Sequence, residues 1–250
     1  MSILSVTGAK GGVGCTAVVA GLAGAWSRQK KAVLAFDLCR QNLLRLHFGL
    51  DWHERDGWHA RLVAGRDWSG AAWRTPDGLS FVPHGSLRDG AAAEVLNNPH
   101  WLAGELASLA LPSDCRLLLD TPQAGRERAQ ALAAATHVLV VLPPEPLSCG
   151  LIEPLEAELS AHGVAQERLL YVLNRFDPTR QLDRDVELLL REMLATRLAP
   201  LPVHRDEAVR EALAMQQQLA DYAAHSQACD DFNQLATWLS IRLNGGAKGR

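Results

Sequence analysis

Short apolar runs alternate with amphipathic stretches along most of the chain. The apolar runs lack an alternation of polar and apolar positions, which predicts strands buried on both faces in a largely parallel sheet covered by helices. We expect strands at residues 3–7, 32–37, 79–83, 116–120, 137–143, 169–174 and 195–203. We expect helices at residues 16–29, 100–110, 125–135, 150–162, 181–194, 205–215 and 228–243. This alternation predicts a doubly wound α/β fold with right-handed crossovers.

The pattern predicts one domain over residues 1–243, followed by a glycine-rich tail at 244–250 that we expect to be disordered. Residues 51–101 depart from the strand–helix rhythm, and we interpret them as a capping subregion. This subregion carries five of the seven tryptophans, namely Trp52, Trp58, Trp68, Trp73 and Trp101. These side chains either fill the small core of the subregion or form a partner surface, since tryptophan concentrates at interface hot spots.

Composition narrows the class of protein. Hydrophobic residues make up 48% and charged residues 21% of the chain, which favours a packed globular domain. The net charge of −3 gives no bulk attraction to nucleic acid. The five cysteines form no CxxC pair, which argues against a disulfide framework or a zinc site and favours a reducing cytoplasm.

Membrane contact is expected only through partners or at the periphery. The apolar run in the N-terminal segment "MSILSVTGAK" is too short for a signal peptide. No window approaches the roughly 18 apolar residues that a membrane-spanning helix needs.

The stretch "GAKGGVGCT" at residues 8–16 lies between the first predicted strand and the first predicted helix. Anions bind at this place in an open α/β sheet, because glycines let backbone N–H groups converge and the helix N-terminus adds partial positive charge. Thr16 is placed to ligate a magnesium ion bound to phosphate. An ordinary phosphate-binding loop has lysine before this hydroxyl residue, whereas this chain has Cys15 there and Lys10 upstream.

The segment "KGGVGCT" resembles the deviant Walker A motif, KGGxGK[ST], of the MinD/ParA family of dimeric P-loop ATPases. The resemblance implies ATP and Mg²⁺ as cofactors and a homodimer in which Lys10 reaches the ATP of the partner. The family's second lysine is Cys15 here, so one positive charge near the phosphates is missing. The implied binding loop comprises Lys10, Gly11, Gly12, Val13, Gly14, Cys15, Thr16 and Ala17.

Two further segments match the family's magnesium-binding parts. "VLAFDLCRQN" at 33–42 places Asp37 at the family's first aspartate, near the metal. The second aspartate, which helps position the attacking water, is Cys39, and a thiol is a poor substitute for a carboxylate. "RLLLDTPQAG" at 116–125 makes Asp120 the expected magnesium ligand and places Gly125 in the γ-phosphate-sensing loop. The metal set is therefore Thr16, Asp37 and Asp120.

Segments late in the chain resemble the family's adenine site. "VLNRFD" at 172–177 implies Asn174 as the base-reading side chain, with Arg175 beside it. "LPVHRDEAVREA" at 201–212 implies Pro202 near the adenine. The resemblance assigns no firm catalytic residue, although Lys10 acting in trans and Asp37 are candidates.

The segments at 37–50, 57–68 and 204–208 resemble the BcsQ (YhjQ) branch of bacterial cellulose-biosynthesis proteins, which also has cysteine at the second aspartate position and lacks the second loop lysine. That resemblance implies a cytoplasmic, ATP-binding, dimerising regulatory subunit of the cellulose synthesis and secretion machinery. Its implied partners are the small protein BcsR and other secretion subunits, with recruitment to the inner membrane by the cellulose synthase. The two missing side chains predict weak or absent hydrolysis.

Two other functions remain open at this level. In the first, the chain is an active positioning ATPase of the partitioning or cell-division type. In the second, it is a scaffold protein that no longer binds nucleotide. The positioning ATPase would need a surface that binds DNA or a membrane. The last helix either targets a membrane or packs on the domain, and its apolar face carries Phe232, Leu235, Leu239 and Leu243. Cys15 is either a reactive thiol with a lowered pKa at a helix N-terminus or a tolerated small side chain.

Overall fold

The computed structural model describes residues 1–86 and 94–245. Within these ranges the strands form an eight-stranded sheet in the order β3-β4-β2-β5-β1-β6-β7-β8. All neighbouring strands are parallel except β3 and β4, which are antiparallel. This arrangement confirms the predicted doubly wound α/β fold.

The strands are β1 (Ser2–Gly8), β2 (Val33–Asp37), β3 (Trp73–Arg74), β4 (Ser80–Val82), β5 (Arg116–Asp120), β6 (His137–Leu142), β7 (Leu169–Phe176) and β8 (Val203–His204). The α-helices are α1 (Cys15–Arg28), α2 (Trp58–Val63), α3 (Trp101–Ser108), α4 (Arg126–Ala134), α5 (Pro146–Ala161), α6 (Gln181–Leu194), α7 (Ala208–Ala214), α8 (Leu219–Tyr222) and α9 (Gln227–Gly245). Short 3-10 helices are η1 (Leu44–Phe48), η2 (Trp68–Ala71), η3 (Glu94–Asn97), η4 (Gln166–Arg168) and η5 (Ala195–Arg197).

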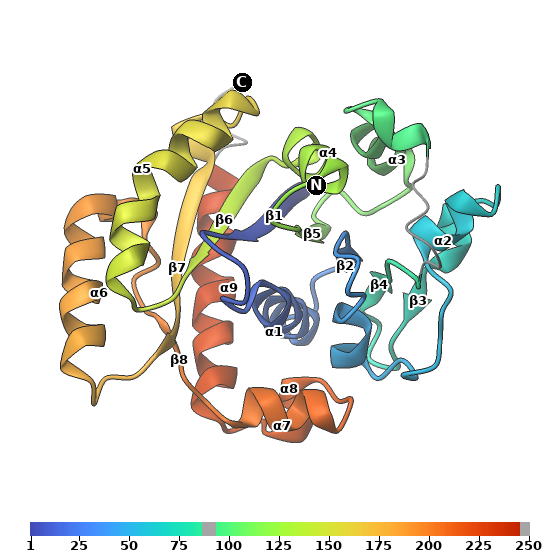
Figure 1. Cartoon of the computed structure of the whole chain (residues 1–250). Helices are drawn as coiled ribbons and strands as arrows, with labels where there is room; N and C mark the ends of the chain where they lie inside the picture. The colour runs from blue at the N-terminus through green and yellow to red at the C-terminus, as the bar shows by residue number, and fades with distance from the viewer. Residues whose placement is uncertain (87–93, 246–250) are drawn as a thin grey trace.

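Helices cover both faces of the sheet. Helices α1 and α9 lie on one face, and α4, α5 and α6 lie on the other (Figure 1). Within β1, Leu4 and Val6 pack toward α1 and α9, whereas Ile3 packs toward α3 and α4. Because successive side chains of a strand point to opposite faces, a strand covered on both sides must be apolar throughout.

The strand predicted at 195–203 is wrong over most of its length. Residues 195–197 form η5, Leu198 makes an isolated bridge to Tyr171, and β8 begins only at Val203. Pro200 and Pro202 interrupt this run, and proline has no N–H to donate to a sheet ladder. The apolar run is therefore a loop that packs against the core.

The C-terminal helix uses its apolar face inside the domain. Phe232, Leu235, Leu239 and Leu243 are all buried, in a cluster shared with α1. The membrane-targeting interpretation of this face is therefore wrong. Among the described residues, no helix is long and apolar enough to cross a bilayer.

The tail that we expected to be disordered from residue 244 begins later. Residues 244 and 245 end α9, and residues 246–250 lie outside the described residues.

The tryptophans of residues 51–101 divide into two groups. Trp58 and Trp68 are buried against Phe36, and Trp101 stacks on Trp58 with ring centroids 5.9 Å apart. Trp52 is 58% exposed, and Trp73, on the edge strand β3, is 40% exposed. Core packing therefore accounts for three of the five side chains.

Candidate functional site

The loop after β1 has the backbone shape of a phosphate-binding loop. Gly12 and Gly14 have φ angles of 78° and 98°, values that residues with a Cβ rarely adopt. Gly14 immediately precedes α1, so the N–H groups of the first helical turn face the loop. Substituting Gly14 would also place a Cβ 2.5 Å from Asn174 Nδ2, so the close approach itself requires glycine.

The Lys10 side chain contacts the segment that precedes α5. Its Nζ forms an ion pair with Glu145, which precedes α5, and the two side chains are 38% and 49% exposed. Within this chain Lys10 therefore lies at the surface beside the loop, where it is accessible to another molecule.

Beneath the loop, Thr16 Oγ1 donates a hydrogen bond to Asp120 Oδ2 at 2.7 Å. Asp37, Cys39 and Asp120 offer ligand atoms that all lie within 4.8 Å of one another, and we call them the acidic cluster. Asp37 and Asp120 end the neighbouring parallel strands β2 and β5, which pair these two residues directly. The parallel register thus joins carboxylates that are 83 positions apart in the sequence.

The carboxylates of Asp37 and Asp120 differ in their hydrogen-bond partners. Asp37 accepts hydrogen bonds from the backbone N–H groups of Cys39, at 2.9 Å, and Leu44, at 3.2 Å. Asp120 Oδ1 is buried and has no hydrogen-bond partner among the described residues. A buried oxygen without a partner, beside the Thr16 hydroxyl, fits a Mg²⁺ ion, which prefers oxygen ligands.

Burial governs protonation in the acidic cluster. Removal from water, together with the neighbouring Asp120 charge, raises the pKa of Asp37 well above its usual value. Burial likewise raises the pKa of Asp120 to about 6. Burial and the same carboxylate raise the pKa of the Cys39 thiol, so this group stays neutral and cannot accept a proton at physiological pH.

The reactive-thiol interpretation of Cys15 is not favoured by its surroundings. Burial, followed by the charge of Asp120, raises the pKa of this thiol to about 12. The thiolate is the reactive form of cysteine, so these surroundings outweigh the helix N-terminus. Cys15 instead acts as a small side chain packed against the core of α1.

A cleft of about 590 Å³ opens in front of the loop. Five of the predicted binding residues line it, namely Gly14, Thr16, Ala17, Asn174 and Arg175. Pro202 does not line this cleft, although the next residue, Val203, does. The size lies in the range of ordinary small-molecule sites.

The lining also includes charged residues that sequence reasoning missed, among them Arg180, Arg205 and Arg210. Arg180 directly precedes α6, Arg205 directly follows β8 and Arg210 lies on α7, and no local motif marks them. Their common signal is a position in or beside loops at the carboxyl end of the sheet, where ligands of this fold class bind.

Asn174 forms a hydrogen bond with the phosphate loop in this structure. Its Nδ2 donates to the Val13 carbonyl oxygen at 2.8 Å, and its side chain is 5% exposed. The base-reading role of Asn174 stays a prediction. The hydrogen bond to Val13 uses the side-chain Nδ2 and leaves the side-chain oxygen for such a role. The adjacent Arg175 has a φ of 63°, and its guanidinium comes within 3.7 Å of the position a Cβ would take at Gly14.

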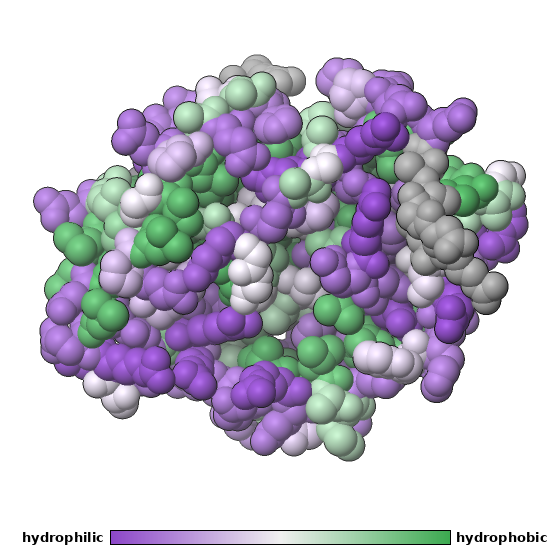
Figure 2. Space-filling view, in the orientation of Figure 1, coloured by the Kyte–Doolittle hydropathy of each residue, from purple (hydrophilic) through white to green (hydrophobic). Residues whose placement is uncertain are grey.

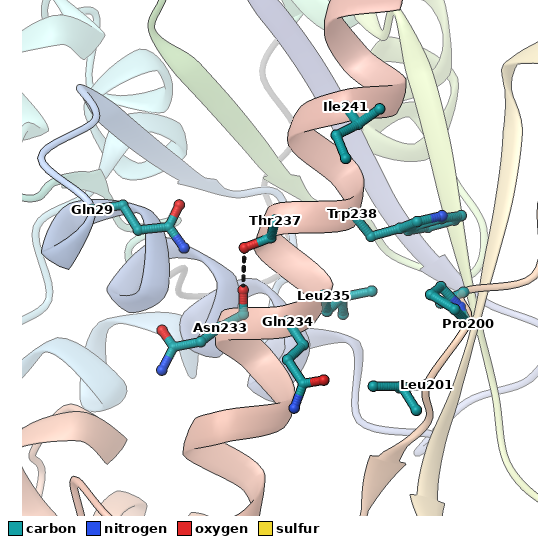
Figure 3. A pocket seen from close by; sticks show the side chains of 10 residues that line it. Gln29, Pro200, Leu201, Asn233, Gln234, Leu235, Thr237, Trp238 and Ile241 are labelled. Carbon is teal, nitrogen blue, oxygen red and sulfur yellow. Dashed lines mark hydrogen bonds between the residues drawn. The ribbon is translucent and has the colours of Figure 1, made fainter.

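Two apolar surfaces lie apart from this cleft. A groove between α9 and the loop before β8 is lined by Trp238, Ile241 and Leu201, among others, and contains no residue of the phosphate loop (Figure 3). Apolar side chains also gather over α5 and α6, at the left of Figure 2. On α6 the exposed ones are Leu182, Leu188, Leu189 and Met193.

The fold defines the class of protein. The structure resembles the cell division ATPase MinD of Pyrococcus furiosus with a TM-score of 0.79, at 23% identity, covering 96% of this chain and 98% of that one. It also resembles cobyrinic acid a,c-diamide synthase from Mycobacterium smegmatis, solved with an ATP analogue and magnesium. That TM-score is 0.77 at 24% identity, covering 100% of this chain and 97% of that one. The chain thus has the fold of MinD/ParA-like P-loop ATPases.

Sequence comparison identifies the family. Residues 1–239 match the family model of the cellulose biosynthesis protein BcsQ. The cellulose biosynthesis protein BcsQ of Escherichia coli (strain K12) is 30% identical over 257 residues, covering 98% of this chain and 96% of the relative. The chain belongs to the BcsQ family.

Proposed function

We propose that this chain binds ATP with Mg²⁺ in the cleft beside the phosphate loop and dimerises around the nucleotide. It hydrolyses ATP slowly or not at all and serves as a regulatory subunit of the bacterial cellulose synthesis machinery. The observation that carries the proposal is the Thr16–Asp120 hydrogen bond of 2.7 Å, lying directly beneath a glycine loop that opens on the cleft. Family membership adds the link to cellulose synthesis.

The residues present fit a nucleotide-bound magnesium ion. Thr16 offers a hydroxyl oxygen at the floor of the cleft, and Asp120 offers its unpartnered Oδ1 nearby. A bound Mg²⁺ would supply positive charge to the phosphates and relieve the buried Asp37–Asp120 pair.

Arg175 compensates in part for the missing loop lysine. Its guanidinium lies beside Gly14 and donates no hydrogen bond to another described residue. Arginine forms strong charge-assisted hydrogen bonds with phosphate oxygens. This side chain therefore brings positive charge to the cleft where Cys15 brings none.

The site lacks groups that fast hydrolysis needs. The Cys39 thiol stays neutral, and it donates to the Asp120 backbone carbonyl oxygen at 3.6 Å instead of facing water as a base would. A positioned general base contributes on the order of 10²- to 10⁴-fold to a rate. A site that binds but scarcely turns over acts as a slow switch whose occupancy sets the stability of the dimer.

The partner side of the proposal rests on exposed residues. Lys10 lies at the surface beside the loop, where a second copy can place it on the facing nucleotide. We assign contacts with BcsR or other secretion subunits to exposed side chains such as Trp52. Such contacts would place the protein in the cytoplasm, at the inner membrane near the cellulose synthase.

Titration with a fluorescent ATP analogue and Mg²⁺ tests the binding proposal. Thr16→Val keeps the shape of the side chain and removes the hydroxyl, and Arg175→Gln removes the added charge. We expect each to weaken binding by about 10- to 100-fold, since hydrogen bonds to charged groups contribute about 1.5–3 kcal/mol. Arg66→Gln, an exposed arginine that does not line the cleft, is the matched control. Wild-type protein that fails to bind the analogue, or equal binding by all variants, rejects the proposal.

A further inference from the structure

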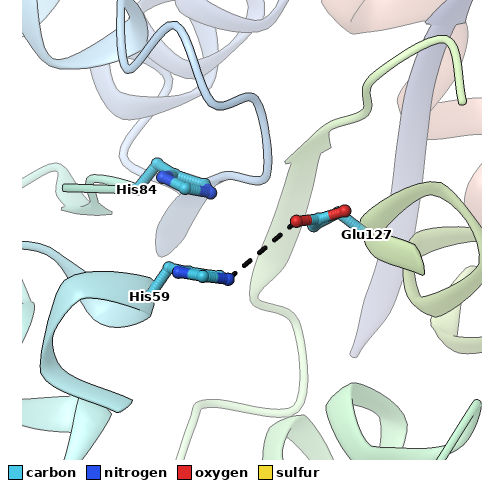
Figure 4. A group of neighbouring side chains, drawn as sticks. All are labelled: His59, His84 and Glu127. Atoms are coloured by element: carbon cyan, nitrogen blue, oxygen red, sulfur yellow. Dashed lines mark ion pairs between the residues drawn. The ribbon is translucent and has the colours of Figure 1, made fainter. Parts of the chain in front are cut away.

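A second group of potential metal ligands lies in the interior of the domain. His59 lies on α2, His84 follows β4, and Glu127 lies in the first turn of α4 (Figure 4). Their ligand atoms lie within 4.8 Å of one another. Both histidines are 0% exposed, and Glu127 is 3% exposed. We call these three residues the histidine cluster.

The hydrogen bonds of His84 leave one nitrogen free. Its Nδ1 lies 2.9 Å from the Gly85 carbonyl oxygen, which can only accept, so Nδ1 carries the proton. Its Nε2 is buried and has no hydrogen-bond partner among the described residues. The ring is thus held in the tautomer whose Nε2 lone pair can bind a metal, by the kind of backbone contact that orients metal-binding histidines.

His59 has fewer hydrogen-bond partners than His84. Neither of its ring nitrogens has a hydrogen-bond partner within the described ranges, and Nε2 lies 4.0 Å from Glu127 Oε1. The two imidazoles stack with centroids 4.9 Å apart and planes 13° apart, and both point toward Glu127 (Figure 4). Buried polar atoms are nearly always paired, so unpaired Nε2 atoms of two rings that face one carboxylate require an explanation.

Both rings are in the form that metals bind. Burial lowers the pKa of His59 to about 4 and also lowers the pKa of His84, so both are neutral at physiological pH. Metal ligation requires this neutral form. The 4.0 Å between His59 Nε2 and Glu127 Oε1 exceeds hydrogen-bonding distance, so a ring hydrogen-bonded to Glu127 does not account for the arrangement.

We propose that His59, His84 and Glu127 form a binding site for a divalent transition metal ion of the Zn²⁺ type. Imidazole nitrogens favour such ions, whereas Mg²⁺ and Ca²⁺ prefer oxygen ligands. Two histidines and one glutamate are a known zinc ligand set that leaves a fourth position for water. The cysteine pattern argued against a zinc site, but this site uses no cysteine.

Binding requires a small contraction and the release of one arginine. A tetrahedral ion with metal–nitrogen distances near 2.1 Å places its ligands about 3.4 Å apart, so the three segments close by roughly 1 Å. Arg40 now donates to Glu127 Oε1 from Nε at 3.3 Å and from Nη2 at 3.2 Å. The Arg40 side chain is 56% exposed and can turn into solvent when a cation replaces it.

The ion would tie together parts of the chain that meet only in the folded state. It would link α2 and the segment after β4 to α4, whose first turn follows the Asp120–Gly125 segment. Trp58 lies next to His59, and its Nε1 donates to the Asp37 backbone carbonyl oxygen at 2.7 Å. The site would therefore stabilise the region that supports the acidic cluster.

Zinc titration of untagged, chelator-stripped protein, followed by calorimetry and elemental analysis, tests the proposal. We expect one equivalent of Zn²⁺ to bind. Glu127→Gln, which keeps the side-chain shape, and His84→Asn should each weaken binding at least about 100-fold, because even groups that only orient ligands contribute 10- to 100-fold. Arg40→Gln should strengthen binding by up to about fivefold, because it removes the competing ion pair.

Two controls separate this site from other zinc ligands. His53→Asn alters an exposed histidine that contacts Asp51 and should leave binding unchanged. Cys39→Ser removes the thiol of the acidic cluster and should also leave it unchanged. Co²⁺ in place of Zn²⁺ should give the visible bands of a tetrahedral site without a thiolate charge-transfer band. Absence of a stoichiometric ion, loss of binding in Cys39→Ser, or full binding in Glu127→Gln and His84→Asn would overturn the proposal.

Discussion

The acidic cluster and the histidine cluster are two buried groups of potential ligands in one fold, and they differ in donor chemistry. The acidic cluster joins two carboxylates and a thiol at the ends of β2 and β5. The histidine cluster joins two imidazoles and one carboxylate from α2, α4 and the segment after β4. Oxygen donors suit magnesium, whereas imidazoles suit a transition metal.

The two clusters also differ in what holds them in place. The carboxyl ends of adjacent parallel strands fix the acidic cluster, as the sheet register of any such fold does. Backbone hydrogen bonds join the two segments that carry the histidines, since His59 N–H donates to the His84 carbonyl oxygen at 3.1 Å, and Trp58 is in edge contact with both histidine rings. The lesson is that the register of two parallel strands builds one site, while local contacts between a short helix and a loop build the other.

The largest expected effect tests that role of the tryptophan core. Trp58→Ala removes a fully buried indole and its hydrogen bond to the Asp37 carbonyl oxygen. We expect it to lower the free energy of unfolding by about 3–5 kcal/mol, measured by urea denaturation. Trp52→Ala, at a side chain that is 58% exposed, should change it by less than about 0.5 kcal/mol. Equal effects of the two variants would contradict the packing account.

The next effect concerns protons in the acidic cluster. The folded-state pKa of Asp120 is about 6, above the ordinary 3.8, so the folded protein binds more protons than the unfolded chain between these values. Stability of the nucleotide-free protein therefore falls as pH rises through this window, by roughly 3 kcal/mol for Asp120. Asp37, with its pKa also raised, adds to the same trend.

Asp120→Asn sharpens the pH prediction, because it keeps an oxygen for the Thr16 hydroxyl and removes the charge. Chemical denaturation across this pH range should show a flatter profile and a more stable protein at neutral pH. An unchanged slope would mean that the buried pair does not control the pH dependence.

A third prediction concerns turnover in the acidic cluster. Cys39→Asp should raise ATP hydrolysis by up to about 10²-fold, because a carboxylate can orient water where the neutral thiol cannot. Cys39→Ser, which adds no carboxylate, is the control for the loss of the thiol alone. If steady-state phosphate release is the same in all three proteins, the missing function lies at Cys15.

The smallest effect concerns Lys10. Lys10→Ala should weaken ATP-dependent dimerisation by about tenfold in sedimentation analysis. It should leave stability within about 0.5 kcal/mol, because the ion pair with Glu145 is exposed. Glu145→Gln frees Lys10 from that pair and should preserve the dimer. A Lys10→Ala protein that dimerises as wild type does would remove the trans role from the account.

Much of the fold could be predicted because its signals are local. Continuous apolar runs mark the central strands, and glycines beside Thr16 mark the loop. The prediction failed at residues 195–203, where the apolar character serves loop packing and two prolines prevent a ladder. Apolar content alone does not distinguish a buried strand from a buried loop.

The candidate site could be predicted in part for the same reason. Thr16 and Asp120 follow strand ends in recognisable segments, and the structure brings them within hydrogen-bonding distance. His59 and His84 sit in no motif and meet because backbone hydrogen bonds and the packing of Trp58 join α2 to the segment after β4. Contacts that depend on side-chain packing between distant segments leave no local trace in a single sequence.

The most direct test of the central claim is the nucleotide content of the purified protein. Protein isolated without added nucleotide would be denatured, the released nucleotide identified by chromatography, and the mass of the native protein measured by light scattering. The account predicts intact ATP at about one molecule per subunit and a dimeric mass, because a site that binds without fast hydrolysis retains its ligand. A monomer that releases no nucleotide would contradict it.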